Sequence, residues 1–341
     1  MGGASWLYPV TGGNRFFVSA AEGFIFLSGL LVGLIYGPRI RRDGLQTIQL
    51  HVLRRAATLY AVTLGLTFTF VGLSRLADMP WLQDVEPVSP GLVASLITLH
   101  HTYYLVDVML LYTLVLAIAP LALLLLHTDR TWIVLVFSIG IWSMYQFFPA
   151  AAQIPWEIAN NETFNVPAWQ LWFFGGMAVG YHHNFIWSRL GRLPRVPTVA
   201  VLVAVAAGLI VLRLVDGAPL AGLGGTADGP AALDLLFDKH AVRPGRLFAF
   251  GVVFSLFYLG LTYLWRPLAR ALGWLMIPFG QNALYVYAMH LFAVYVSALL
   301  LPYVPGFDRF NPLHNTPVQV VSVLVIWLLV KRQILFDVIP R

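Results

Sequence analysis

The sequence predicts an all-α polytopic membrane protein whose chain crosses the bilayer about nine times. Hydrophobic residues make up 59% of the 341 residues and charged residues only 11%, whereas soluble domains carry about 25% charged residues. The mean hydropathy is +0.77. The apolar residues gather in runs of about 20, the length that spans a bilayer as a helix. We therefore expect one integral membrane domain over residues 1–341.

Each predicted helix follows from one apolar run. The runs lie near residues 17–36, 51–74, 102–126, 131–148, 166–183, 197–215, 247–265, 279–300 and 317–336. In the first run Gly29, Gly33 and Gly37 recur every four residues, a spacing that lets a second helix approach closely. Pro278 precedes the eighth run. Pro317 takes the first position of the ninth run, where a missing N–H costs little.

The distribution of basic residues predicts the orientation. The positive-inside rule places the short Arg-rich segment 184–196 in the cytoplasm, and with it the C-terminus. Residue 1 and the long loops 75–101, 149–165 and 216–246 then lie outside, which directs binding or chemistry to the outer face of the membrane. No signal peptide is visible. We therefore expect a tenth helix, upstream of the first run, in a full-length form.

Two acidic residues interrupt apolar runs. An ionised carboxylate at membrane depth needs a partner or a water-filled cavity. Glu22, in "SAAEGFIFLSGLLVGLIYG", either lines a cavity or lies near the outer interface, solvated or paired with Arg15. Its place near the glycine stripe predicts that it faces protein. Asp107, in "HHTYYLVDVMLLY", shares a helix face with Tyr103, and we favour a functional role over structural pairing.

Basic and polar residues mark three further candidate sites. Arg54 and Arg55, in "HVLRRAATLY", either anchor the cytoplasmic end of the second run or bind a phosphorylated cytosolic donor. The outer segment "FDKHAVRPGRLFAF" is either a solvated loop or an anion site. In "FGQNALYVYAMHLFAVY", Asn282 and His290 share a helix face. His290 is either a buried neutral histidine or a proton-handling group.

Taken in order, five stretches of the chain resemble the OpgC family of the acyltransferase-3 superfamily. They are "SAAEGFIFLSGLLVGLIYG", "HTYYLVDVMLLYTLVLAIAP", "NVPAWQLWFFGGMAVGY", "FDKHAVRPGRLFAF" and "FGQNALYVYAMHLF". The resemblance implies a ten-helix inner-membrane enzyme that moves succinyl groups from the cytosolic CoA pool to osmoregulated periplasmic glucans. The superfamily's first helix carries an Arg-containing motif and a histidine regarded as catalytic. No segment before Ser19 matches it, which agrees with a missing first helix.

We therefore expect a membrane O-acyltransferase. In the rival class, a transport protein, the same intramembrane charges would line a pathway. Attack by a glucan hydroxyl on a thioester needs a base and donors for the oxyanion. The candidates for catalysis are Glu22, Asp107 and His290. The candidates for substrate binding are Arg54, Arg55, Tyr112, Trp169, Gln170, Lys239, Arg246 and Asn282.

Within that set, Arg246 is expected to bind the succinyl carboxylate with help from Lys239, while Tyr112, Trp169 and Gln170 line the acceptor path. Acyl-CoA, as donor substrate, and a glucan acceptor are the expected partners, together with the bilayer and a glucan synthase. No bound cofactor, metal site or nucleic acid is expected. The absence of cysteine excludes disulfides and thiolate chemistry. The alternatives are a transporter or flippase for a glycan or lipid-linked sugar, and a membrane scaffold for a glucan synthase.

Overall fold

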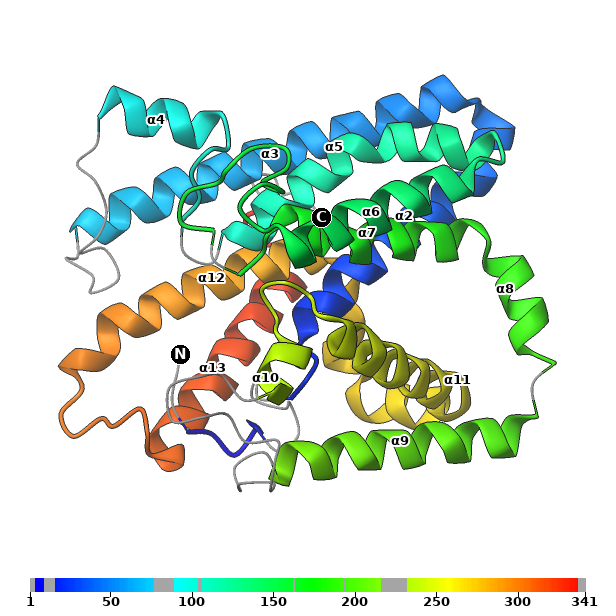
Figure 1. The fold of residues 1–341 in the computed structure, drawn as a ribbon. Coiled ribbons are helices and arrows are strands. Elements are labelled where there is room, and N and C mark those ends of the chain that lie inside the picture. Colours follow the sequence, from blue (N-terminus) through cyan, green and yellow to red (C-terminus); the bar gives the residue numbers. More distant parts are fainter. Residues whose placement is uncertain are drawn as a thin grey trace. The chain divides into compact units, whose positions relative to one another are not determined.

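The computed structural model describes residues 4–8, 16–76, 89–103, 106–161, 163–192, 194–215 and 232–336. The chain forms two compact units. The first contains residues 16–67 and 86–257, and the second contains residues 1–15, 68–85 and 258–341. Helices α3 and α11, which are labelled in Figure 1, contribute residues to both units.

The described residues form helices and no named strand. The helices are α2 (Ala20–Asp43), α3 (Leu45–Leu76), α4 (Pro90–Ile97), α5 (Asp107–His127), α6 (Thr131–Phe147), α7 (Val166–Tyr181), α8 (His183–Leu190), α9 (Arg195–Val215), α10 (Ala232–Phe237), α11 (Pro244–Gln281), α12 (Ala283–Leu300) and α13 (Pro312–Lys331). Seven of these are long and apolar enough to cross a membrane, namely α2, α3, α5, α9, α11, α12 and α13. Helix α6 is also apolar but has only 17 residues. The prediction of an all-α membrane protein is confirmed, whereas the number of crossings stays a prediction.

Each of the nine predicted runs lies mainly in one helix, but several boundaries were wrong. Helix α2 continues to Asp43 and α3 already begins at Leu45. Helix α11 continues through the predicted loop to Gln281 and changes direction at Leu264, which has non-helical dihedral angles. Pro267 follows three residues later and lacks the N–H that would bond to the preceding turn. Helix α13 begins at Pro312 because Asn311 caps it, accepting the Leu313 N–H at 3.0 Å. Pro317 therefore lies inside the helix.

Helices α2 and α7 are packed in backbone contact. A Cβ atom on Gly29 would lie 1.9 Å from the carbonyl oxygen of Phe173, and one on Gly180 would lie 2.1 Å from that of Leu30. Neither position has room for a side chain, so only glycine allows the helices to approach this closely. The close packing predicted from the glycine stripe is confirmed, with α7 as the partner helix.

Contacts in the first unit fix the relative directions of two helix pairs. Positions that meet along α2 and α7 increase together, from Gly29 at Phe173 to Gly33 at Met177, so these helices are parallel. Helices α3 and α5 are antiparallel, because Gln49 bonds to Pro120 and Thr63 to Thr113. In the chain, α3, α5 and α6 lie between the parallel helices α2 and α7.

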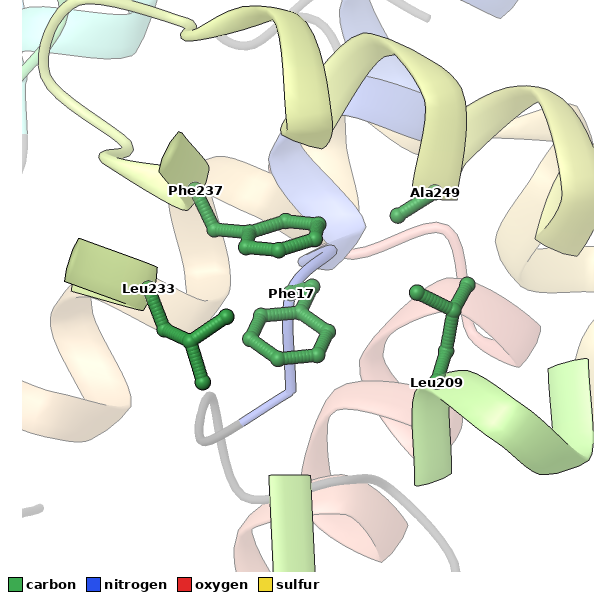
Figure 2. Close-up of a cluster of buried hydrophobic side chains, with 5 residues drawn as sticks. All are labelled: Phe17, Leu209, Leu233, Phe237 and Ala249. Atoms are coloured by element: carbon green, nitrogen blue, oxygen red, sulfur yellow. The ribbon is translucent and has the colours of Figure 1, made fainter. Parts of the chain in front are cut away.

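A cluster of buried apolar side chains holds the beginning of α2 beside α10 and α11. It consists of Phe17, Leu209, Leu233, Phe237 and Ala249 (Figure 2). The rings of Phe17 and Phe237 stack with centroids 3.8 Å apart. Burying one such ring stabilises the fold by about 1.5–3 kcal/mol. The cluster therefore fixes the first turn of α2 next to the first turn of α11.

The second unit is built from α12, α13 and the later part of α11. The hydroxyl of Tyr285 donates to the carbonyl of Ile334 at 2.6 Å, joining α12 to the turn that follows α13. The indole of Trp327 donates to the carbonyl of Trp274 at 2.9 Å, joining α13 to α11. The amide of Asn315 donates to Ala4, so the described N-terminal residues pack on this unit.

Candidate functional site

The candidate site lies in the first unit, at the N-terminal ends of α2, α5, α7 and α11. Glu22 meets Arg246 and, one turn further along both helices, Phe26 meets Phe250, so α2 and α11 are also parallel. The ring of Tyr112 near the start of α5 contacts Phe24 of α2 and Phe173 of α7. The first turn of a helix has unpaired N–H groups and a partial positive charge. The place where these helices begin therefore favours an anion.

Glu22 occupies the first turn of α2, and its side chain is fully buried. The N–H of Ser19, the residue that caps α2, donates to Oε2 of Glu22 at 2.9 Å. The Ser19 hydroxyl donates to the same oxygen. The Ser-x-x-Glu spacing is the sequence signal for this arrangement, and it was not used in the prediction for Glu22.

The other oxygen of Glu22, Oε1, accepts a hydrogen bond from Nε of Arg246 and completes a buried ion pair. Glu22 therefore faces protein, as predicted. The alternative of a solvated carboxylate was wrong, and Arg15, the other expected partner, lies outside the described residues. Both carboxylate oxygens of Glu22 already accept hydrogen bonds. Glu22 can therefore hold Arg246, but neither oxygen is free to accept a proton from a substrate.

Arg246 retains donors that the protein does not use. Its side chain is only 5% exposed. Besides the bond to Glu22, Nη1 donates to the carbonyl of Phe237 at 3.2 Å. A guanidinium has five N–H donors, and within the described part of the chain Nη2 has no hydrogen-bond partner. The ion pair thus fixes the orientation of the guanidinium and leaves one nitrogen for a ligand.

Lys239 is a second cation at this site. Its Nζ lies 5.5 Å from the ring centroid of Phe164, and no described residue forms an ion pair with it. Burial lowers the pKa of the Lys239 ammonium. The negative charges of Glu22 and Asp107 act against this lowering of the pKa, whereas the positive charge of Arg246 adds to it. Lys239 is therefore within electrostatic reach of all three residues.

The turn that carries Lys239, residues 238–243, is held by two side chains of α6. The indole of Trp142 donates to the carbonyl of Val242 at 2.9 Å, and the amide of Gln146 donates to that of Ala241 at 2.7 Å. Val242 is fully buried and has a φ of 51°. This region is unfavourable for a β-branched residue, at a cost of about 1–3 kcal/mol. Nothing in the sequence marked Trp142 and Gln146 as residues of the site except that they are four positions apart and so share a helix face.

Asp107 is the first residue of α5 and is half-buried. Its Oδ1 accepts the N–H of Val108 at 2.9 Å. No described residue donates to Oδ2. Unlike Glu22, Asp107 therefore has an oxygen free to accept a proton from a substrate.

The three residues expected to line the acceptor path are all buried in the first unit. Tyr112 packs between aromatic rings of α2 and α7. Trp169 contacts Phe164 with ring centroids 4.6 Å apart, and its indole N–H has no partner among the described residues. Gln170 accepts the Ser138 hydroxyl at 2.7 Å and donates to the Ser138 carbonyl at 2.8 Å, so its amide joins α7 to α6.

The remaining candidates lie elsewhere. Arg54 and Arg55 are exposed on α3, and neither forms an ion pair with a described residue. Asn282 and His290 belong to the second unit. The amide of Asn282 donates to the carbonyl of Pro278 at 2.9 Å, and the His290 ring lies 6.3 Å from that of Tyr287. Their functional roles stay predictions.

Comparison with known proteins identifies a family. A family model described as OpgC protein matches residues 3–336, which is nearly the whole chain. No curated protein and no solved structure matches the chain. In the described residues, no group of three His, Asp or Glu side chains could hold a metal ion.

Proposed function

The chain belongs to the OpgC protein family, and we propose that it is a membrane O-acyltransferase that moves succinyl groups from a CoA-derived donor to hydroxyl groups of periplasmic glucans. Family membership supports a glucan-modifying acyltransferase-like role. The choice of succinyl rests on one observation. Arg246 is held by Glu22 with its Nη2 unused, and Lys239 lies within electrostatic reach.

A succinyl group differs from an acetyl group by a second carboxylate, which is ionised at neutral pH. A guanidinium binds a carboxylate with short, charge-assisted hydrogen bonds. Arg246 offers Nη2 for such a bond, and Lys239 supplies a second positive charge. The starts of four helices add a favourable potential for an anion. An acetyl group has nothing that these cations would bind.

In the proposed reaction, the oxygen of a glucan hydroxyl attacks the thioester carbonyl carbon of the donor. A C–O bond forms and the C–S bond breaks. Asp107 accepts the hydroxyl proton as general base and returns it to the departing thiolate. Glu22 acts as a positioning residue, because both of its oxygens already accept hydrogen bonds. His290 remains a second candidate for the base.

The membrane arrangement is also a proposal. The protein lies in the bacterial inner membrane, with the site facing the periplasm and the C-terminus facing the cytoplasm. Arg54 and Arg55 then lie toward the cytoplasmic side of α3, where they bind the phosphates of the donor or anchor the helix. A glucan synthase is the protein partner expected to supply the acceptor.

The sharpest test replaces Lys239, because it lies outside the buried ion pair. Lys239→Ala should lower succinyl transfer to a glucan by about tenfold or more, since a hydrogen bond to a charged group contributes about 1.5–3 kcal/mol. Acetyl transfer should fall much less. Lys331→Ala is a matched control, because the Nζ of Lys331 also lies over an aromatic ring, at 5.1 Å from that of Trp327.

Arg246→Ala should lower succinyl transfer by roughly 30-fold or more, because removing one partner of a desolvated charge pair costs about 2–5 kcal/mol. The assay follows label from succinyl-CoA or acetyl-CoA into the glucan. Equal losses with both donors would mean that the cations are structural, or that they bind the CoA phosphates or the glucan. Movement of unmodified glycan across the membrane without acyl transfer would support a transporter instead.

A further inference from the structure

Two segments outside the helices form a small rigid structure beside the start of α5. Residues 98–103 lead into α5, and residues 154–161 precede α7. The Thr102 N–H donates to the carbonyl of Ala159 at 3.0 Å, and the Ala159 N–H donates to that of His100 at 2.8 Å. His101 and Ala159 form a parallel bridge. The side chains on these segments are therefore held in fixed positions.

The two segments present a flat ring pair. The imidazole of His100 stacks on the indole of Trp156, with centroids 4.8 Å apart and planes 12° apart. The Trp156 N–H donates to the carbonyl of Leu99 at 3.0 Å. Nδ1 of His100 lies 3.0 Å from the Thr98 hydroxyl. Each ring is thus oriented by its own polar atom, and His100 is exposed.

Polar groups lie on the neighbouring residues. Nδ2 of Asn160 is 3.0 Å from Nε2 of His101, and Asn160 is exposed. The amide oxygen of Asn160 has no partner among the described residues. Leu99 and Asn160 have φ values of 59° and 60°. Non-glycine residues rarely adopt this conformation, and in proteins it is concentrated at functional sites.

We infer that His100, Trp156 and Asn160 form a binding platform for a sugar ring of a neutral glucan. The inference rests on the proposed function and names where the acceptor binds. A pyranose ring has an apolar face of C–H groups that packs on a flat aromatic surface, as weak C–H contacts and the ring quadrupole favour. Its hydroxyl groups are donors and acceptors for an amide. None of these side chains carries a fixed charge, which suits an uncharged ligand.

The platform is connected directly to the proposed base. His100 and Asp107 are seven residues apart in one continuous segment, so they are separated by at most about 25 Å. A glucan of several sugar units can span this distance. A ring bound at the platform therefore holds the polymer while a hydroxyl of another unit reaches Asp107.

The test measures glucan binding separately from acyl transfer. Trp156→Ala and Asn160→Gly should each raise the KM for the glucan by about tenfold, with kcat and the KM for the acyl donor unchanged. The glycine variant accommodates the positive φ of residue 160, so it removes the side chain without straining the backbone. His100→Phe should retain binding, because it keeps a flat stacked ring. Trp132→Ala, which removes an exposed tryptophan of α6, is the matched control.

Direct titration of the purified protein with a neutral glucose oligosaccharide, without donor, completes the test. Weaker binding in Trp156→Ala than in Trp132→Ala supports the platform, even if the protein transfers no acyl group. Acyl transfer with an unchanged KM for the glucan in Trp156→Ala and Asn160→Gly would overturn the platform and leave the proposed function standing. Loss of binding in His100→Phe as well as Trp156→Ala, with unchanged thermal unfolding, would refute stacking as the mode of recognition.

Discussion

Removing Glu22 alone should destabilise the protein more than removing Glu22 and Arg246 together. In Glu22→Ala the guanidinium of Arg246, which is 5% exposed, keeps only its bond to the Phe237 carbonyl. A buried charge without its partner costs about 3–5 kcal/mol. The double variant Glu22→Ala/Arg246→Ala leaves no unpaired charge, so it should recover most of this loss.

The measurement is the apparent melting temperature in one detergent, followed by helical circular dichroism. With about 2 °C per kcal/mol for a chain of this size class, Glu22→Ala should melt lower by on the order of 6–10 °C. The matched control is Asp43→Ala, which breaks the exposed ion pair with Arg42. Exposed pairs contribute little, so this control should show no clear shift.

Two results would refute this reasoning. The first is a shift in Glu22→Ala no larger than that in Asp43→Ala, which would mean that the buried charge is solvated or repaired by movement. The second is a double variant whose loss equals the sum of the single losses, because independent sites are additive and coupled ones are not. Either result would remove the basis for treating Arg246 as a guanidinium held in place by Glu22.

The remaining predictions concern packing, topology and pH. Gly180→Ala should lower the melting temperature clearly, because overpacking costs about 1–3 kcal/mol. Gly175→Ala should not lower it, because a Cβ there meets no atom within 4 Å. Equal effects of the two substitutions would contradict the close contact between α2 and α7. A cysteine at Glu157 should react with an impermeant maleimide on intact cells and one at Arg192 should not; the reverse pattern would invert the topology. The preference for succinyl over acetyl should fall with rising pH as Lys239 loses its proton. Because burial lowers the pKa of Lys239, this fall should begin at a lower pH than the usual pKa of 10.5 would give. Lys239→Arg, whose charge persists, should abolish this fall, and an unchanged alkaline fall would exclude Lys239 as its cause.

Helix positions could be predicted from the sequence because the signal is local. An apolar run of about 20 residues satisfies its own backbone hydrogen bonds only as a helix in a membrane. The spacing of Gly29, Gly33 and Gly37 likewise predicted a close helix contact. The ends were less certain, because the cap at Asn311 and the kink at Leu264 depend on a few polar or strained residues rather than on the run itself.

The partners could not be predicted, because they are set by which helices meet. Glu22 and Arg246 are 224 residues apart, and nothing in either stretch specifies the other among 15 acidic and 21 basic residues. The sequence by itself determined that a carboxylate lies near the start of the first apolar run and that basic residues gather before α11, and it left open whether that carboxylate is solvated or buried. Only the tertiary structure decided that this carboxylate would hold Arg246, because Phe17, just before α2, packs in one cluster with Phe237 of α10 and Ala249 of α11. A buried charge is then stable only where packing has already placed its partner.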